Sequence, residues 1–240
     1  MTDGPPRAPG ATGSGPRVGL GSPRLHLRRT DSTNTRARQL AAAGAPHGTL
    51  VTAGEQTSGR GRQGRSWSAP AGRALLCSLV VRDPPRLLSL AAGVAVAELV
   101  GPEAWVKWPN DVLVDGGKVA GILVEGRPQE RWAVLGIGLN VAGGQDDLPV
   151  ELRGVAATLG LAPEAIEPTL ARLLAGLERW IPASAADVLQ TIRGRDALCG
   201  HGVRWAGGEG RAEGIDPAGR LVVRSGGRVH ALDAGEVHLL

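Results

Sequence analysis

The sequence predicts an α+β fold in which strands and helices share the first part of the chain and a small β-barrel follows them. Short β-rich runs alternate with stretches of helical periodicity up to Gly194. After Gly194 the runs become shorter, and glycine-rich turns separate them at close spacing. The 240 residues also suffice for one domain of ordinary size with a small appended unit.

Helices are expected where apolar residues recur at helical spacing and turn residues follow. Residues 31–34 carry side chains that cap helices, and a short helix is expected to follow them until Gly44. A second apolar stretch predicts a buried helix that Gly101 and Pro102 stop. The predicted helices are Thr35–Ala43, Leu87–Val100, Ile166–Ile181 and Ala185–Ile192.

Strands are expected in the β-rich runs between these helices and after them. Asp115-Gly116-Gly117 predicts a tight hairpin turn because glycine accepts the positive φ that such turns need. In the larger unit the predicted strands are Arg24–Arg29, Thr49–Ala53, Ala74–Val81, Trp105–Trp108, Val112–Val114, Val119–Glu125 and Trp132–Asn140. In the smaller unit they are Val203–Trp205, Arg211–Ile215, Leu221–Val223 and Val229–Leu232.

Composition narrows the class of protein. The hydrophobic fraction of 42% is enough for a core, and tryptophan is the only aromatic residue because Phe and Tyr are absent. The net charge of +4 is modest and the arginines are scattered, so charge alone is weak evidence for nucleic-acid binding. RNA-binding modules that stack bases depend on aromatic side chains. We therefore expect no nucleic-acid partner.

Cysteine usage and the apolar runs predict a cytoplasmic protein. Cys77 and Cys199 lie far apart and lack metal-ligand spacing, so two reduced thiols are expected. The longest apolar stretch, Leu87–Ala97, is too short to span a bilayer, and no membrane partner is expected. Residues 1–23 contain six glycines and five prolines without an apolar signal-peptide core, which predicts a disordered tail.

A glycine- and arginine-rich loop is the first candidate for function. It runs Gly59-Arg60-Gly61-Arg62-Gln63-Gly64-Arg65-Ser66-Trp67, and no acidic residue occurs between Gln56 and Arg82. Glycine lets backbone N–H groups approach a ligand, and arginine adds paired donors for phosphate or carboxylate. The loop lacks the Gly-Lys-Ser/Thr ending of a P-loop. A solvated flexible turn and a loose RNA-contact segment are the alternatives.

Further polar side chains stand at predicted strand ends. In Lys107-Trp108-Pro109-Asn110-Asp111, the amide and carboxylate follow a proline and can orient a metal, an amine or a ribose, or simply end the strand. Lys118 opens the next apolar strand, where a solvated lysine is the alternative. Gly121 inside that strand indicates close approach of a ligand, or a bulge. Gly136–Asn140 lacks the third glycine of a dinucleotide fingerprint, and its glycines can make room for an adenine or for packing.

Taken in order, these segments resemble the biotin protein ligases. The resemblance is strongest over residues 30–140, and the C-terminal residues resemble the family's small SH3-like domain. It implies a mixed β-sheet flanked by helices, as in class II aminoacyl-tRNA synthetases and lipoate ligases. The matching segments are Asp31-Ser32-Thr33-Asn34, Glu55-Gln56-Thr57, the loop through Trp67, residues 107–111, Gly117–Leu123, Gly136–Asn140, Gly214-Ile215-Asp216 and Ala234-Gly235-Glu236-Val237.

The resemblance also implies a domain organisation and a reaction. A catalytic domain is expected at residues 24–194 and the SH3-like domain at 195–240. Because no helix-turn-helix module precedes residue 24, the expected activity is that of a ligase without a repressor function. ATP and Mg²⁺ would convert biotin to biotinyl-5′-AMP, and biotin would pass to one lysine of a carboxylase's biotin carboxyl carrier domain. A lipoate or octanoyl ligase on the same scaffold is the nearest alternative.

Each matched residue takes an implied role. The expected biotin-binding residues are Ser32, Thr33, Asn34, Gln56, Gly59, Arg60, Arg62, Lys118 and Gly121. The expected ATP-binding residues are Arg62, Arg65, Trp67, Lys107, Asn110, Lys118 and Asn140. Catalysis is expected to depend on Lys118, Arg62, Arg60 and Asp111, with Asp111 either contacting Mg²⁺ or orienting the acceptor amine. Ser66, Ser68 and the segment Ala69–Leu75 depart from the family's pattern, which leaves details of the pocket wall open.

Overall fold

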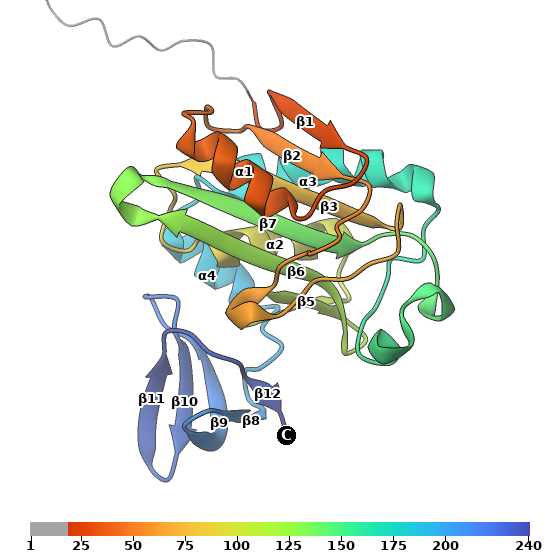
Figure 1. Ribbon diagram of the computed structural model, residues 1–240. Coiled ribbons are helices and arrows are strands. Elements are labelled where there is room, and N and C mark those ends of the chain that lie inside the picture. Colours follow the sequence, from red (N-terminus) through yellow and green to blue (C-terminus); the bar gives the residue numbers. More distant parts are fainter. Residues whose placement is uncertain (1–18) are drawn as a thin grey trace, which may run out of the picture.

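Seven strands form the mixed sheet that organises the larger part of the chain (Figure 1). Their order is β1-β2-β3-β7-β6-β5-β4, in which β1 and β2 run parallel and the other neighbours antiparallel. This computed structural model describes residues 19–240, without the side chains of residues 127 and 128. The strands are β1 (Arg24–Leu27), β2 (Leu50–Ala53), β3 (Ala74–Arg82), β4 (Ala104–Lys107), β5 (Asp111–Val114), β6 (Gly117–Arg127) and β7 (Trp132–Asn140).

Helices cover the two faces of this sheet (Figure 1). On one face α1 (Thr33–Ala42) packs on β2, β3 and β7. On the other, α2 (Leu88–Val100) packs on β4, β5 and β6, and it contacts both α3 (Ile166–Trp180) and α4 (Ala185–Arg193). Because side chains alternate along a strand, Val80 of β3 joins the cluster under α1, whereas its neighbours Leu79 and Val81 join the core around α2.

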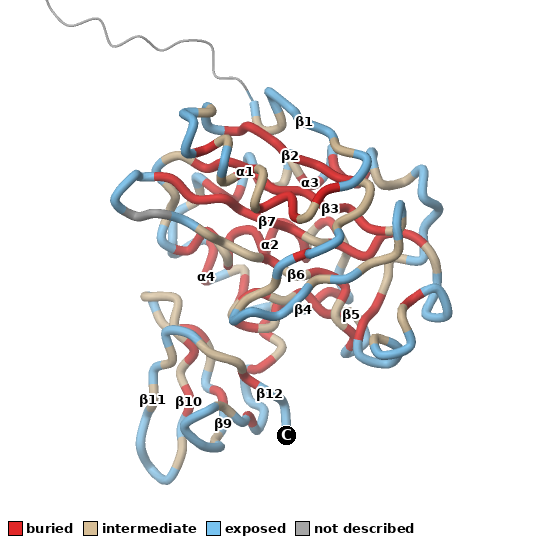
Figure 2. Tube along the Cα trace, in the orientation of Figure 1, coloured by how far each residue is buried: buried red, intermediate tan, exposed pale blue. Residues whose placement is uncertain are grey.

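The sequence of α2 reflects its enclosure. Ten of its 13 residues are buried, so it needs no polar face toward solvent. Figure 2 shows the buried residues concentrated in the central strands and in this helix. Within residues 19–240, no helix is long and apolar enough to cross a membrane.

A second sheet follows the helical layer (Figure 1). Its strands are β8 (Gly202–Trp205), β9 (Gly208–Ile215), β10 (Leu221–Ser225), β11 (Arg228–Leu232) and β12 (His238–Leu239), in the order β11-β10-β9-β8-β12. All its neighbours pair antiparallel. The indole N–H of Trp108, at the end of β4, donates to the carbonyl of Gly219 in this unit (3.0 Å) and so ties the two sheets together.

Most predicted elements are confirmed within a few residues. The strand Trp132–Asn140 has the predicted bounds, and the hairpin turn before β6 has Asp115 and Gly116 at φ 49° and 76°. Helix α1 begins at Thr33, two residues earlier than predicted, because Ser32 itself takes the extended N-cap conformation. Strand β12 and the short 3₁₀ turns were not predicted, since two or three residues carry no periodic signal.

The predicted tail, residues 1–23, is described only from Gly19 onward, and residues 1–18 lie outside the described chain. The N–H of Leu20 donates to Glu178 Oε1 (2.8 Å), and the N–H of Gly21 donates to the carbonyl of Gly48 (2.9 Å). The chain therefore joins the fold before residue 24.

The core assignment can be tested at Leu135, which lies in the middle of β7 and is 0% exposed. Replacing it with alanine leaves a cavity, and we expect the free energy of unfolding to fall by about 2–5 kcal/mol in urea denaturation. Val150 is 73% exposed, so Val150→Ala serves as the control and should change stability by less than about 0.5 kcal/mol. Equal losses for the two variants would contradict the assignment.

Candidate active site

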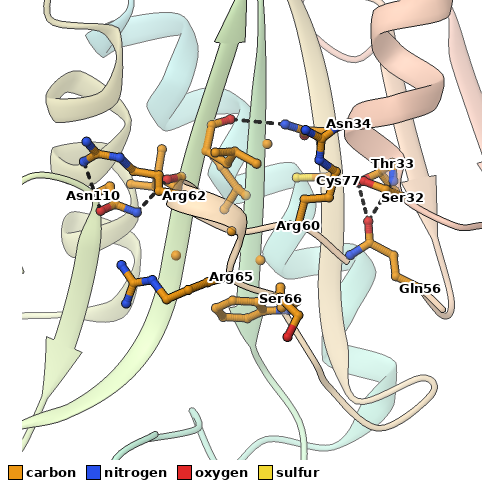
Figure 3. A pocket seen from close by; sticks show the side chains of 18 of the residues that line it. Ser32, Thr33, Asn34, Gln56, Arg60, Arg62, Arg65, Ser66, Cys77 and Asn110 are labelled. Atoms are coloured by element: carbon orange, nitrogen blue, oxygen red, sulfur yellow. Dashed lines mark hydrogen bonds between the residues drawn. The ribbon is translucent and has the colours of Figure 1, made fainter. Parts of the chain in front are cut away.

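A cavity of about 100 Å³ lies on the α1 face of the sheet, between that helix, strands β6 and β7, and the glycine- and arginine-rich loop (Figure 3). It gathers residues that are far apart in the sequence. Eleven of the predicted site residues line it: Ser32, Thr33, Asn34, Gln56, Arg60, Arg62, Arg65, Trp67, Asn110, Lys118 and Gly121.

One end of the cavity presents amide and hydroxyl groups from the start of α1. The backbone N–H and the hydroxyl of Thr33 both donate to Gln56 Oε1, at 2.7 and 2.9 Å. The Ser78 hydroxyl, which comes from β3, lies 2.8 Å from Thr33 Oγ1 and 2.6 Å from Asn34 Oδ1. Ser32 stands at the N-cap without capping the helix through its side chain, and it is buried beside this group. This end suits a small ring that both donates and accepts hydrogen bonds.

Glycines on β6 and β7 provide the space for two of the lining side chains. A Cβ at Gly136 would overlap the amide of Asn34, and a Cβ at Gly138 would overlap the indole of Trp67. A Cβ at Gly121, which pairs with Gly138 across the two strands, would stand 3.0 Å from Trp67 Cζ3. The indole therefore lies flat in a hollow of the sheet that only glycine permits.

The loop is closed on itself and over this hollow. The N–H of Trp67 donates to the carbonyl of Gly59 (2.9 Å), and the N–H of Gly61 donates to that of Arg65 (2.7 Å). The ammonium of Lys118 lies 5.7 Å from the centre of the Trp67 ring. The indole N–H is buried and finds no hydrogen-bond partner among the described residues. A buried donor left unpaired costs about 1–3 kcal/mol, so this group favours an acceptor from a ligand.

The cations around the cavity differ in their pairing. Arg60 Nη2 lies 2.9 Å from Glu125 Oε1, and Arg65 pairs with Glu236 of the smaller unit. Arg62 makes no ion pair within the described chain, and its closest polar partner is Asn110 Oδ1 at 3.4 Å. Burial lowers the pKa of Arg62, because water solvates its positive charge poorly at this position. A guanidinium in this position favours an anion as its partner.

A lysine and a carboxylate face each other beside Arg62. Lys118 Nζ lies 2.6 Å from Asp111 Oδ1, yet the approach lacks hydrogen-bond geometry and leaves that buried oxygen without a donor. Asp111 pairs across the hairpin with Lys107, whose pKa is lowered by burial although Asp111 opposes the shift. The amide of Asn110 is fixed by donating to the carbonyl of Ile122 (2.9 Å).

Four of the predicted site residues do not line the cavity. Asp111 pairs with Lys118 and lies opposite Lys107 across β4 and β5, and Gly59 is buried, where a Cβ would overlap the carbonyl oxygen of Trp67. Asn140 is buried at the end of β7 and donates to the carbonyl of Ala157 (2.9 Å). The structure therefore does not bring Asn140 to the cavity.

Sequence reasoning missed three residues of the site. Ser78 and Cys77 lie within the apolar strand β3, where a single small polar residue looks like core. Burial raises the pKa of the Cys77 thiol to about 12, so it stays protonated. Glu125 lies within β6 and pairs with Arg60. The usable signal was one carboxylate directly after the apolar run Val119–Val124 of β6, which does not show what Glu125 pairs with.

Comparison with known proteins agrees with this geometry. Residues 26–141 match the Biotin/lipoate A/B protein ligase family, and residues 208–240 match the Biotin protein ligase C terminal domain. The chain is 39% identical to the biotin–[acetyl-CoA-carboxylase] ligase of Mycobacterium tuberculosis, over 88% of this chain and 86% of that protein. It is 36% identical to the enzyme of the same name from Paracoccus denitrificans, over 88% and 98%.

A solved structure gives the same result. The biotin protein ligase from Aquifex aeolicus in complex with biotin and ATP is 26% identical, with a TM-score of 0.74, covering 91% of this chain and 99% of that one. The fold and the matches define a ligase of the biotin and lipoate class. The chain belongs to the biotin protein ligase family, as the sequence predicted, with the mixed sheet and the C-terminal domain of that family.

A substitution at Gly138 tests whether the position of the Trp67 indole depends on this hollow. We expect Gly138→Ala to expel the indole from its hollow, so that trypsin cleaves the loop at its arginines about tenfold faster than in wild type. Gly144→Ala is the control, because a Cβ there meets nothing within 4 Å and its φ of −97° suits alanine. Unchanged cleavage in Gly138→Ala would show that Trp67 does not depend on this hollow.

Proposed function

We propose that this chain activates biotin with ATP to biotinyl-5′-AMP and then transfers biotin to one lysine of a biotin carboxyl carrier domain. The observation that carries the proposal is the polarity of the cavity, with amide and hydroxyl groups at one end and Arg62 beside Lys118 at the other. A neutral ureido ring with a carboxylate tail fits this arrangement. The names of the Mycobacterium and Paracoccus relatives support a carboxylase as acceptor, and the Aquifex complex supports biotin and ATP as substrates.

In this proposal the ureido ring contacts Ser32, Thr33 and Gln56, and the valeryl chain runs along the indole of Trp67, which itself covers Gly121 and Gly138. Thr33 and Ser78 are already hydrogen-bonded to their neighbours, so the polar end is preorganised and little ordering is needed on binding. The carboxylate then reaches the cations at the other end.

The first half-reaction brings two anions together. A biotin carboxylate oxygen attacks the α-phosphorus of ATP, the new P–O bond forms, and the bond to pyrophosphate breaks. Of the three arginines that line the cavity, Arg62 is the one without an ion pair to another described residue, and Lys118 lines the same cavity. Placed in a site shielded from water, such groups stabilise the transition state more than they would in solvent.

Mg²⁺ would neutralise phosphate oxygens when bound, and Asp111 is the residue that fits it. Its Oδ1 is buried, and Lys118 Nζ lies 2.6 Å away without the geometry of a hydrogen bond. Among the described residues, no group of three metal-binding side chains exists, so the other ligands would be phosphate oxygens and water, as is usual for Mg²⁺.

The second half-reaction begins when a carrier lysine attacks the carbonyl of the mixed anhydride. The new amide bond forms and AMP departs with the electrons of the broken C–O bond. The amine loses its proton, for which Asp111 is the second candidate role. The loop and Trp67 would shield the anhydride from water until the carrier arrives. We further propose a catalytic domain at 24–194, an SH3-like domain at 195–240, and a cytoplasmic location, which the two free cysteines support.

The direct test is a transfer assay. Purified protein is mixed with MgATP, labelled biotin and a biotin carboxyl carrier domain, and label is followed on the carrier. Label that requires ATP and the carrier's lysine would support the proposal. Label from lipoate in place of biotin would make the chain a lipoate ligase, and activity with neither would refute both.

Lys118→Ala should abolish most adenylate formation, because it removes the cation that pairs with Asp111 and lines the cavity. We expect pyrophosphate release to fall by about 100- to 1,000-fold. Lys107→Ala is the comparison, since these are the two lysines of the chain and Lys107 does not line the cavity. Unchanged release in Lys118→Ala would exclude this role.

Arg62→Gly should act on retention more than on synthesis. Without its guanidinium the loop loses its contact with Asn110 and its charge toward the adenylate. We expect the dissociation rate of preformed biotinyl-5′-AMP to rise by about 10- to 100-fold. Retention equal to wild type would contradict the role of Arg62.

A further inference from the structure

Glu125 joins three side chains from two other elements at the wall of the cavity. Asn34 Nδ2, at the start of α1, donates to Glu125 Oε2 at 2.9 Å. Arg60 Nη2, in the first part of the loop, lies 2.9 Å from Glu125 Oε1, and Arg38 Nη1 lies 3.4 Å from the same oxygen. The Glu125 side chain is only 17% exposed. A carboxylate removed from water to this extent is stable only when it is paired.

This carboxylate ends a chain of polar contacts that begins at the opposite side of the cavity. Gln56 accepts from Thr33, Thr33 and Asn34 both contact the Ser78 hydroxyl, and Asn34 donates to Glu125. Figure 3 shows Gln56 and Thr33 at one side of the group, with Asn34 and Arg60 close together further along. The ring-binding end is thus connected to the loop by side chains that lie within hydrogen-bond distance of one another.

Packing leaves Asn34 no alternative position. It is 4% exposed and lies against Gly136, where a Cβ would overlap its amide oxygen. Apart from Glu125, its amide nitrogen finds only the carbonyl of Leu123, at 3.4 Å. A buried amide that loses its main acceptor is destabilised where it stands, and the Ser78 contact is disturbed with it.

The contact with Arg38 helps to distinguish two possible roles of Glu125. If Glu125 only attached α1 to the sheet, its contact with Arg38 would be the relevant one. That pair is the longer one, at 3.4 Å against 2.9 Å for Arg60, although both guanidinium groups are partly exposed, at 38% for Arg38 and 44% for Arg60. Arg60 instead belongs to the loop and lines the cavity, so its pairing acts on the part that covers the ligand.

We propose that Glu125 is a positioning residue for biotin activation, which holds Asn34 at the floor of the cavity and Arg60 at the base of the loop. This inference rests on the proposed function and deepens it. Glu125 does not line the cavity and touches no reacting atom; it acts through Asn34 and Arg60. It also means that the charge of Arg60 is engaged by the protein itself, which leaves Arg62, whose guanidinium has no ion pair among the described residues, to face the substrate anions.

The test compares Glu125→Gln with Arg38→Gln. Glutamine keeps the size of the side chain but loses the charge that holds Arg60. We expect the KM for biotin to rise by about 10- to 100-fold in Glu125→Gln, because charge-assisted hydrogen bonds are lost, while kcat for pyrophosphate release stays within about threefold of wild type. Arg38→Gln should leave both parameters unchanged.

Leakage of the adenylate gives a second readout. Biotinyl-5′-AMP that escapes acylates lysines of a bystander protein such as serum albumin, and labelling of the enzyme itself is limited because the chain has only two lysines. Bystander label per pyrophosphate released should increase about tenfold in Glu125→Gln. An Arg60→Gln variant should leak similarly, and the double variant no more than either single one, since both remove the same contact.

A third readout needs no turnover and separates this inference from the proposed function. Trypsin should cleave the loop of ligand-free Glu125→Gln faster than that of wild type or Arg38→Gln. Equal cleavage in the three proteins, or parallel changes in Glu125→Gln and Arg38→Gln, would overturn the positioning role. A wild-type protein without activity on biotin would refute the proposed function while the cleavage result still decides the role of Glu125.

Discussion

The site depends on one constraint, the absence of side chains at three positions of one sheet face. Gly121 of β6 pairs with Gly138 of β7, and Gly136 lies one step along β7 on the same face. This leaves a hollow in a sheet that is otherwise densely packed. Asn34 enters it from α1 and Trp67 from the loop. The polar contacts through Asn34 and the covering of the cavity by Trp67 are therefore both possible because these three positions carry no side chain.

The hollow also explains why the start of α1 departs from ordinary capping. Ser32 stands at the N-cap, yet its side chain does not bond to the helix, and the side chains of Thr33 and Asn34 are directed to Gln56, Ser78 and Glu125. A residue type that favours helix starts is thus used for the cavity instead. The sequence predicted the helix correctly, but the expected capping by side chains is wrong, and the contacts that these side chains make instead became visible only with β3 and β6 beside them.

The sequence could predict a feature of the site where the residues that form it are close together in the chain, and not where they come from distant segments. Lys118, the loop and the strand Trp132–Asn140 were predicted because motif and periodicity are local properties. The pairing of charges was not predictable in this way. The loop contains no acidic residue, which indicated free cations, yet Glu125 and Glu236 reach Arg60 and Arg65 from distant segments. Asn140 was expected at the nucleotide, and the structure instead pairs it with the carbonyl of Ala157, a contact made by a segment without periodicity.

The two attachments of the loop differ in strength, and this sets how the cavity opens. Arg65 and Glu236 are 51% and 40% exposed, so water screens their pair, and such pairs contribute only about 0–1 kcal/mol. Arg60 is itself 44% exposed, but it is bound to a carboxylate that is only 17% exposed and that also accepts from Asn34. The loop should therefore release first from the smaller unit, at Arg65, and pivot about Arg60, which stays on the sheet. In this arrangement Arg62 and Trp67 can leave a bound ligand while the polar floor beneath it remains intact.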